Sequence, residues 1–323
     1  MRTFRLWPLL LLFLAIPLRL SAQGAALPTG TRNAALRYWM AFSELKDEPL
    51  DKNTALLLER IEQGKAPWNE KALGHLLDSN LHAIQIMRRA TKLPECDWGM
   101  EASSEEPVGL IYKARVLARL NTLEGMRLAA RGDSEGAVSS WLDGIKFSQD
   151  VAKGGTLIFL LIGRSAMLSN LDAIKSAASS GELNADSRSA AKAVLNALPP
   201  TGFDWGAAWL LESAATENTW QVILKSKNPA AKYEELVGEE LDRDFHLPNQ
   251  AELQSYRSFM NDVAAELRRP PADARIPLKR LFDREKSLNP LFQNIIPNFE
   301  KANASREEVL AARQAALDAL GSK

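Results

Sequence analysis

The apolar positions of this chain recur at intervals of three and four residues, the spacing of one face of an α-helix. Four segments show it clearly, and they span residues 35–45, 73–84, 110–130 and 253–267. No stretch alternates apolar and polar residues as a half-buried strand does, and valine is scarce beside alanine and leucine. The sequence therefore predicts an all-α protein.

Capping residues and prolines mark where the predicted helices begin and end. Asn69 precedes the stripe at 73–84 and is a favourable N-cap residue. Asn249 with Glu252, and Ser305 with Glu308, have the spacing of a capping box. Prolines fall between the periodic segments, and about ten helices with short connections result. We therefore expect stacked antiparallel helical hairpins.

The helix predicted over residues 107–131 is apolar on more than one side. Its apolar residues step mostly by three, so the stripe turns around the helix. They are Leu110, Ala114, Leu117, Leu120, Leu123, Met126 and Ala130. Such a surface needs neighbours on several sides. We expect an inner helix in a layered stack, followed by a second helix that begins after Gly132-Asp133.

Gly125, Gly132, Asp133, Ala137 and Trp141 form a pattern across this hairpin. A small residue lies in the first helix, a Gly-Asp turn follows, and the second helix carries a small residue and then an aromatic one. The hairpin resembles one tetratricopeptide-type repeat. The resemblance implies that Gly125 and Ala137 let the two helices approach closely. Because no second segment repeats the pattern, it implies an irregular tetratricopeptide-like array.

Four short stretches in the middle third of the chain carry a broader resemblance. They are 95–99 (ECDWG), 114–120 (ARVLARL), Gly132-Asp133, and 157–163. Together they resemble a group of uncharacterised exported bacterial all-helical proteins. This resemblance implies a helical fold in the cell envelope and carries no activity, substrate or catalytic residue.

The first residues indicate a compartment. Arg2 and Arg5 precede an uncharged apolar run over 6–18, and small residues follow. This order is typical of a secretory signal peptide, which we predict over residues 1–22. The protein is then periplasmic or extracellular, with no membrane span after cleavage. The alternative is an uncleaved N-terminal membrane anchor, since Arg19 stands just before the small residues.

The net charge of the chain bears on its binding partners, and its length bears on the number of domains. The chain has 40 basic and 40 acidic residues, and removal of residues 1–22 leaves a net charge of −3. A protein that binds nucleic acid usually carries a basic excess, so we expect no nucleic-acid partner. The length predicts an N-terminal helical-hairpin region over 27–198 and a C-terminal helical region over 199–323, or one continuous domain.

Cys96 is the single cysteine, so an intramolecular disulfide is impossible. A thiolate is a strong nucleophile, which makes a catalytic Cys96 one hypothesis. The other is a buried, slowly reacting thiol beside Trp98, and we predict the latter.

Metal ligands are the next candidates. Glu235, Glu239, Asp242 and His246 are spaced four, three and four, so they share one face of a helix predicted over 233–246. The alternative is a surface helix with these acids in solvent. Its inward residues are then Val237, Leu241 and Phe245. A single helix rarely surrounds an ion, so we assign no metal site here.

His75 and His82 also lie on one helical face, with Asp78 between them. The four-residue spacing of the two histidines in an H-E-x-x-H zinc motif is missing, which favours polar surface residues. Asn303 begins a glycosylation sequon, a pattern short enough to arise by chance.

Glu212 lies in the apolar stretch WLLESA, where a carboxyl group can act as a general acid. All-helical envelope enzymes that cleave glycan strands use such a glutamate. The alternative places Glu212 on an outward face with Ala208, Ala215 and Thr219.

We assign no catalytic, cofactor-binding or metal residue. The hypothesis that fits best is a non-enzymatic exported protein that binds a protein or peptide partner in the envelope, because stacked hairpins form concave binding surfaces. The alternative is an all-helical envelope hydrolase that uses a carboxylate such as Glu212.

Overall fold

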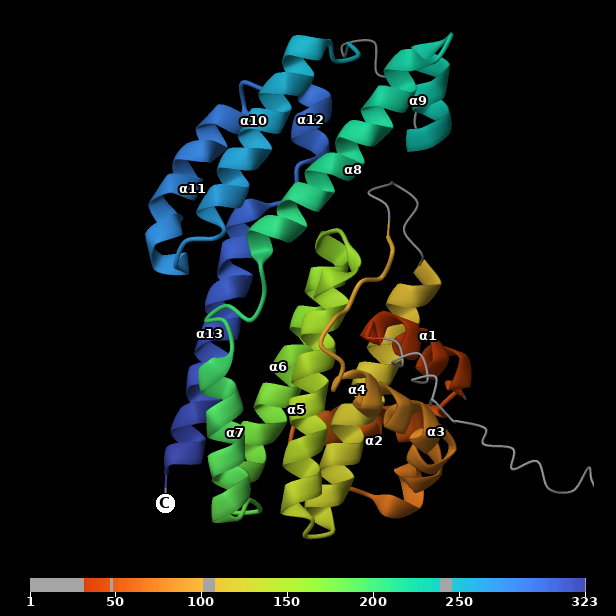
Figure 1. Ribbon diagram of the computed structural model, residues 1–323, viewed down its shortest axis with the longest axis vertical. Coiled ribbons are helices and arrows are strands. Elements are labelled where there is room, and N and C mark those ends of the chain that lie inside the picture. The colour runs from red at the N-terminus through yellow and green to blue at the C-terminus, as the bar shows by residue number, and fades with distance from the viewer. Residues whose placement is uncertain (1–31, 47–48, 101–107, 239–245, 323) are drawn as a thin grey trace, which may run out of the picture. The chain divides into compact units, whose positions relative to one another are not determined.

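A computed structural model describes residues 32–46, 49–100, 108–238 and 246–322 (Figure 1). Over these residues the chain forms thirteen α-helices and one short 3-10 helix, and the only extended pairing is an isolated bridge between Asn33 and Glu95. The prediction of an all-α fold is confirmed, with somewhat more helices than expected.

The helices follow one another in this order: α1 (Ala34–Glu44), α2 (Lys52–Glu62), α3 (Glu70–Ala90), α4 (Val108–Ala130), α5 (Ser134–Val151), the 3-10 helix η1 (Ala152–Gly154), α6 (Leu157–Ser179), α7 (Ala185–Ala197), α8 (Trp205–Lys225), α9 (Pro229–Val237), α10 (Gln250–Glu266), α11 (Pro271–Glu285), α12 (Pro290–Ile295) and α13 (Phe299–Gly321).

Two hydrophobic clusters hold these helices together in one compact unit that begins at Asn33. The first cluster is built mainly from α1, α3 and α4, and the second from α7, α8, α10, α11 and α13. Helices α5 and α6 contribute buried side chains to both clusters. These two helices therefore connect the halves of the core, and the division predicted at residue 198 stays a prediction.

Small residues allow α4, α5 and α6 to pack at short range. A Cβ added to Gly125 of α4 would lie 2.3 Å from the indole nitrogen of Trp141 on α5. A Cβ on Gly144 of α5 would lie 2.5 Å from Asn170 on α6, and one on Gly163 of α6 would lie 2.4 Å from a backbone oxygen of α5. Real Cβ atoms do not approach other atoms this closely, so each glycine is needed for the packing.

Helix α4 has the surroundings predicted for an inner helix, since it contacts α1, α3, α5 and α6. Most of the predicted stripe is buried, namely Leu110, Ala114, Leu117, Leu120 and Leu123, and Met126 is half-buried. The prediction is wrong at the end of the helix, where Ala130 is exposed and Ala129 is buried instead. The reason is that the chain turns away at Gly132, whose φ of 80° lies in the left-handed region.

Two of the three predicted helix starts are confirmed. The Asn69 side chain accepts from the N–H of Ala72, and Asn249 with Glu252 forms a capping box. The capping box predicted at Ser305 is wrong, because α13 begins earlier. Its N-cap is Asn298, whose side chain accepts from the N–H of Lys301.

The stripe predicted over 253–267 is confirmed. Its members are each at most 4% exposed, and they are Leu253, Tyr256, Met260, Val263 and Leu267. They let α10 pack against α8 and α11.

Among the described helices, α6 is the one long and apolar enough to cross a membrane. Its most apolar window is 56% buried, and it contacts α4, α5, α8 and α13. That position in the core accounts for its composition, because a helix buried on several sides is apolar all round. The predicted signal peptide lies outside the described residues.

The α4–α5 hairpin yields a stability prediction. Ala137 is fully buried in the second hydrophobic cluster, so Ala137→Leu should lower the free energy of unfolding by about 1–3 kcal/mol through overpacking. Urea unfolding of the purified protein measures this. Ala130→Leu, at an exposed position of the same hairpin, is the matched control and should leave the midpoint unchanged. Equal midpoints for all three proteins would contradict the packing described here.

Candidate functional site

Helix α5 carries two buried carboxyl groups, Asp143 and Asp150, about two turns apart. Their side chains are 6% and 0% exposed. A buried charge is costly unless it is paired and hydrogen-bonded, so their partners define the local structure.

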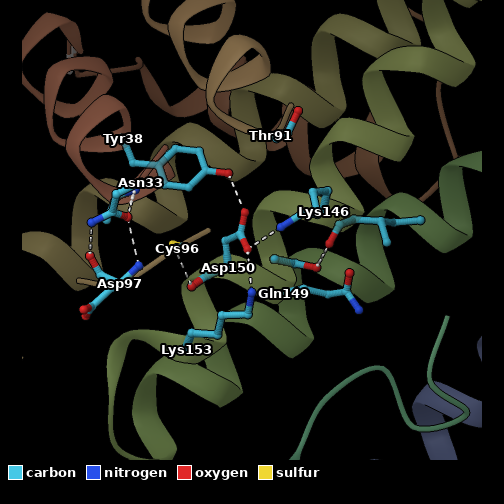
Figure 2. A network of polar contacts seen from close by, with 12 residues as sticks. Asn33, Tyr38, Thr91, Cys96, Asp97, Lys146, Gln149, Asp150 and Lys153 are labelled. Atoms are coloured by element: carbon cyan, nitrogen blue, oxygen red, sulfur yellow. Dashed lines mark hydrogen bonds and ion pairs between the residues drawn. The ribbon is translucent and has the colours of Figure 1, made fainter. Parts of the chain in front are cut away.

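Asp150 is the centre of the polar network in Figure 2. The Tyr38 hydroxyl donates to its Oδ2 over 2.9 Å. Lys146 and Lys153 both form ion pairs with its Oδ1, the second over 3.2 Å. Burial, and then the Asp150 carboxylate, raise the pKa of Tyr38 far above its ordinary value, which keeps the phenol neutral and donating. The network joins α1 to α5.

The segment before α4 is held against the same turn of α5. The Trp98 indole donates to the backbone oxygen of Asp150 over 2.7 Å, and Cys96 Sγ lies 3.8 Å from that oxygen. On the other side, the Asn33 amide donates to the backbone oxygen of Asp97 and accepts from its N–H (Figure 2). These contacts fix residues 95–99 between α1 and α5.

Asp143 is held differently. The Thr91 hydroxyl and the Lys92 ammonium both donate to its Oδ1, over 2.7 and 2.5 Å. Within the described part of the chain, Asp143 Oδ2 has no hydrogen-bond donor. This second oxygen belongs to a side chain that lines an open groove.

The α5–α7 groove, as we call it, has a volume of about 640 Å³. Its lining residues are Thr91, Lys92, Glu135, Val138, Ser139, Leu142, Asp143, Lys146, Asn184, Asp186, Ser187, Ala190 and Val194. The volume falls in the range of about 300–1,000 Å³ that is typical of ligand sites.

The two helices that border the groove begin side by side, since the N–H of Asn184 donates to Ser134 Oγ over 3.1 Å. The exposed acids Glu135 and Asp186 therefore stand together where α5 and α7 start. An apolar middle follows, and Lys92 with Lys146 lie at the far end. The groove is thus acidic at one end. The two lysines at the other end already form ion pairs with Asp143 and Asp150.

Ser187 adds a further polar group to this groove. The residue is 4% exposed, and its buried hydroxyl oxygen has no hydrogen-bond partner among the described residues. A buried polar atom without a partner costs free energy.

Glu212 has a structural role. Its Oε2 accepts from the N–H of Leu157 over 3.1 Å, at the start of α6. The N-cap residue Thr156 makes no side-chain capping bond there, so Glu212 supplies the cap from α8. The outward face predicted around Glu212 is wrong, because Ala208 and Ala215 are buried. Glu212 does not line the α5–α7 groove.

The helix predicted over 233–246 is also wrong. Helix α9 ends at Val237, because Gly238 adopts a left-handed φ of 78° and closes the helix. Val237, expected to point inward, is 45% exposed. The other residues of the predicted face, which are Glu239, Leu241, Asp242 and Phe245, lie outside the described residues.

The two remaining members of the proposed ligand face have local partners. Glu235 pairs with Lys232, and His246 Nε2 lies 2.9 Å from Glu252 Oε1. Among the residues described, no group of three or more histidine, cysteine or acidic side chains is placed to hold a metal ion.

His75, Asp78 and His82 are exposed on α3, and Asp78 pairs with Arg127 over 2.7 Å. Asn303 is buried inside α13 and donates to a backbone oxygen of α11 over 3.2 Å. A glycan on its amide is incompatible with this packing.

Compared with models of protein families, with curated proteins and with solved structures, the chain matches none of them. The two resemblances are therefore supported only by the sequence patterns described above. The part of them that the structure supports is the all-helical fold.

The sequence analysis missed Asp143 and Asp150. The signal present was the spacing of Lys146, Asp150 and Lys153, which allows ion pairs on one helical face. Nothing in the sequence distinguishes this spacing from a solvated surface, because the buried partners Tyr38 and Thr91 come from distant segments.

Cys96 should react slowly in the native protein. Burial, and then Asp150, raise the pKa of its thiol to about 12, so little thiolate is present near neutral pH. We expect alkylation by iodoacetamide at pH 8 to be at least about tenfold slower than in the urea-unfolded chain. Cys96 is half-buried rather than buried as predicted. Native labelling as fast as unfolded labelling would contradict the raised pKa of the thiol.

The same shift predicts a loss of stability in alkali. The folded-state pKa lies above the ordinary value of 9.0, so the unfolded thiol loses its proton first. The stability that this thiol contributes is present below pH 9.0 and falls as the pH rises toward about 12. A Cys96→Ala variant should show a smaller decrease over that interval.

The cap formed by Glu212 can be tested by removal. Glu212→Ala should lower the free energy of unfolding by about 1 kcal/mol, since it leaves the first N–H of α6 without its partner. Glu182→Ala, at an exposed acid, is the control and should change stability little. An unchanged midpoint for Glu212→Ala would leave this residue without the structural role described here.

Proposed function

We propose that this protein is exported and acts without catalysis, by binding a peptide segment of a partner in the α5–α7 groove. The partner segment carries a basic side chain beside one or two apolar ones. The observation that carries the proposal is the groove itself, which combines an apolar middle with exposed acids at one end.

The apolar middle supports binding through burial. The exposed Ala190 and the 39% exposed Val194 come from α7, Leu142 of α5 is half-buried, and Val138 of α5 is buried. Covering such side chains is favourable by about 25 cal/mol per Å² of apolar surface. Exposed apolar residues gathered in a concave surface are typical of binding sites.

The acidic end supports selection of a cation. Glu135 and Asp186 have no ion-pair partner among the described residues, whereas Lys92 and Lys146 are paired with Asp143 and Asp150. A lysine or arginine of the partner therefore gains attraction at the acidic end and meets no free cation elsewhere in the groove. Asp143 Oδ2 offers a further hydrogen-bond acceptor.

The hydrolase alternative has less support. Glu212 is engaged in capping α6, and the thiol of Cys96 has a raised pKa. A general acid or nucleophile needs to reach substrate in a cleft, and neither residue lines the α5–α7 groove. An exported binding protein with tetratricopeptide-like hairpin packing accounts for the same features.

A peptide selection tests this proposal. The purified protein is used to select from a displayed random-peptide library, and the enriched peptides are measured by fluorescence anisotropy. We expect enriched sequences with lysine or arginine beside apolar residues. Ala190→Trp fills the groove and should weaken their binding about tenfold or more.

Matched variants make the result specific. Ala193→Trp places the same side chain at an exposed position of α7 outside the groove and should bind like wild type. Glu135→Gln with Asp186→Asn should weaken basic peptides, whereas Glu234→Gln should not. Enriched peptides without basic residues, or equal binding by Ala190→Trp and wild type, would overturn the proposal.

A further inference from the structure

A second groove lies along α4, bordered by α2 and α6, and we call it the α4–α6 groove. Its volume is about 590 Å³. Side chains from α2, α3, α4 and α6 line it, and none of them lines the α5–α7 groove. The two sites are therefore separate in their residues.

The inner walls of this groove are aliphatic. Leu58, Leu120 and Leu123 are buried behind its surface. Leu76 and Met126 are only partly buried and pack against the first hydrophobic cluster. Half-covered aliphatic side chains along a concave surface leave apolar area for a ligand to cover.

Two hydroxyl groups along the groove are engaged by the protein itself. Thr122 Oγ1 lies 3.1 Å from the backbone oxygen of Ala118 and 3.2 Å from Asn170 Oδ1. The Ser169 hydroxyl donates to the backbone oxygen of Ser165 over 3.1 Å. A peptide laid in this groove would find few partners for its backbone N–H and C=O groups, and unpaired backbone groups are costly to bury.

The charged groups of the groove leave one cation open. Arg119 forms a two-pronged ion pair with Glu62, with N–O distances of 2.5 and 2.7 Å, and so joins α4 to α2. Arg115 lies one turn earlier on α4, lines the groove and is exposed. It has no ion-pair or hydrogen-bond partner among the described residues.

We propose that the α4–α6 groove binds an amphiphile with a single hydrocarbon chain and one carboxylate, of the long-chain fatty-acid class. The chain lies against the aliphatic walls, and the carboxylate binds the Arg115 guanidinium at the exposed edge. One apolar body and one anion match a groove with aliphatic side chains, in which Arg115 is the charged group without a partner among the described residues.

The extent of the lining favours a ligand with a chain. Its lining runs from Leu50 and Leu58 through the length of α4 to Met126, and across to Ser169 on α6. Positions 115 and 126 on α4 are about 16 Å apart along the helix axis, at 1.5 Å per residue. A hydrocarbon chain of sixteen carbons can extend over a lining of this length.

Calorimetric titration with hexadecanoate, below the concentration at which it forms micelles, tests this proposal. We expect saturable binding at one site. Arg115→Gln should weaken it about tenfold or more, because a hydrogen-bonded ion pair is lost. Ser165→Trp replaces a small exposed lining residue, fills the groove and should abolish binding.

Two controls separate the head from the chain. Hexadecyltrimethylammonium, with the same chain and a cationic head, should bind weakly and should not be weakened further by Arg115→Gln. Arg89→Gln and Ser179→Trp change exposed residues that do not line the groove and should bind hexadecanoate like wild type.

Several outcomes would overturn the inference. They are the absence of saturable binding, equal affinity for the carboxylate and the cationic amphiphile, and unchanged binding by Ser165→Trp. Ala190→Trp, which fills the other groove, should leave hexadecanoate binding unchanged. This variant also keeps a failure here distinct from a failure of the proposed peptide site.

Discussion

The close approach of α4, α5 and α6 is the constraint on which the other features of this structure depend. Gly125 makes room for Trp141, Gly144 for Asn170, and Gly163 for a backbone oxygen of α5. Larger residues at these points would force Trp141, Asn170 or the α5 backbone to move. Helices α5 and α6 belong to both hydrophobic clusters, so such a change would reach the whole core. Both grooves are bordered by these same helices.

Buried polar groups on α5 complement this packing with directional contacts. Asp150 binds Tyr38 of α1, and Asp143 binds Thr91 at the end of α3. Contacts between apolar surfaces are not directional, so they do not fix one relative position of two helices. Removing the partners of a buried carboxylate, in contrast, lowers the stability of the protein by several kcal/mol. The two aspartates therefore fix the position of α1 and α3 on α5. In the case of Asp143, the same group that fixes a helix also forms one wall of the α5–α7 groove.

Three candidate catalytic or metal-binding residues of the sequence make structural contacts in the fold. Glu212 caps α6, Cys96 is held against the backbone of Asp150, and His246 pairs with Glu252. The open features lie elsewhere, in two grooves of opposite character. The first has an apolar middle and acids without an ion-pair partner among the described residues. The second combines aliphatic side chains with an arginine that has no partner in the same part of the chain. The peptide site and the fatty-acid site that we propose use this difference between the two grooves.

The sequence by itself determined the all-α class, the inner position of α4 and the buried stripe of α10, because helical periodicity is a local property of the chain. It also located the cap at Asn69. It failed at Ser305 and at the helix over 233–246, where Asn298 and Gly238 placed the helix ends differently. Only the tertiary structure decided which acids are buried and which surfaces stay open. These outcomes depend on contacts between residues more than fifty positions apart, such as Tyr38 with Asp150 and Leu157 with Glu212, and no spacing along the chain encodes them.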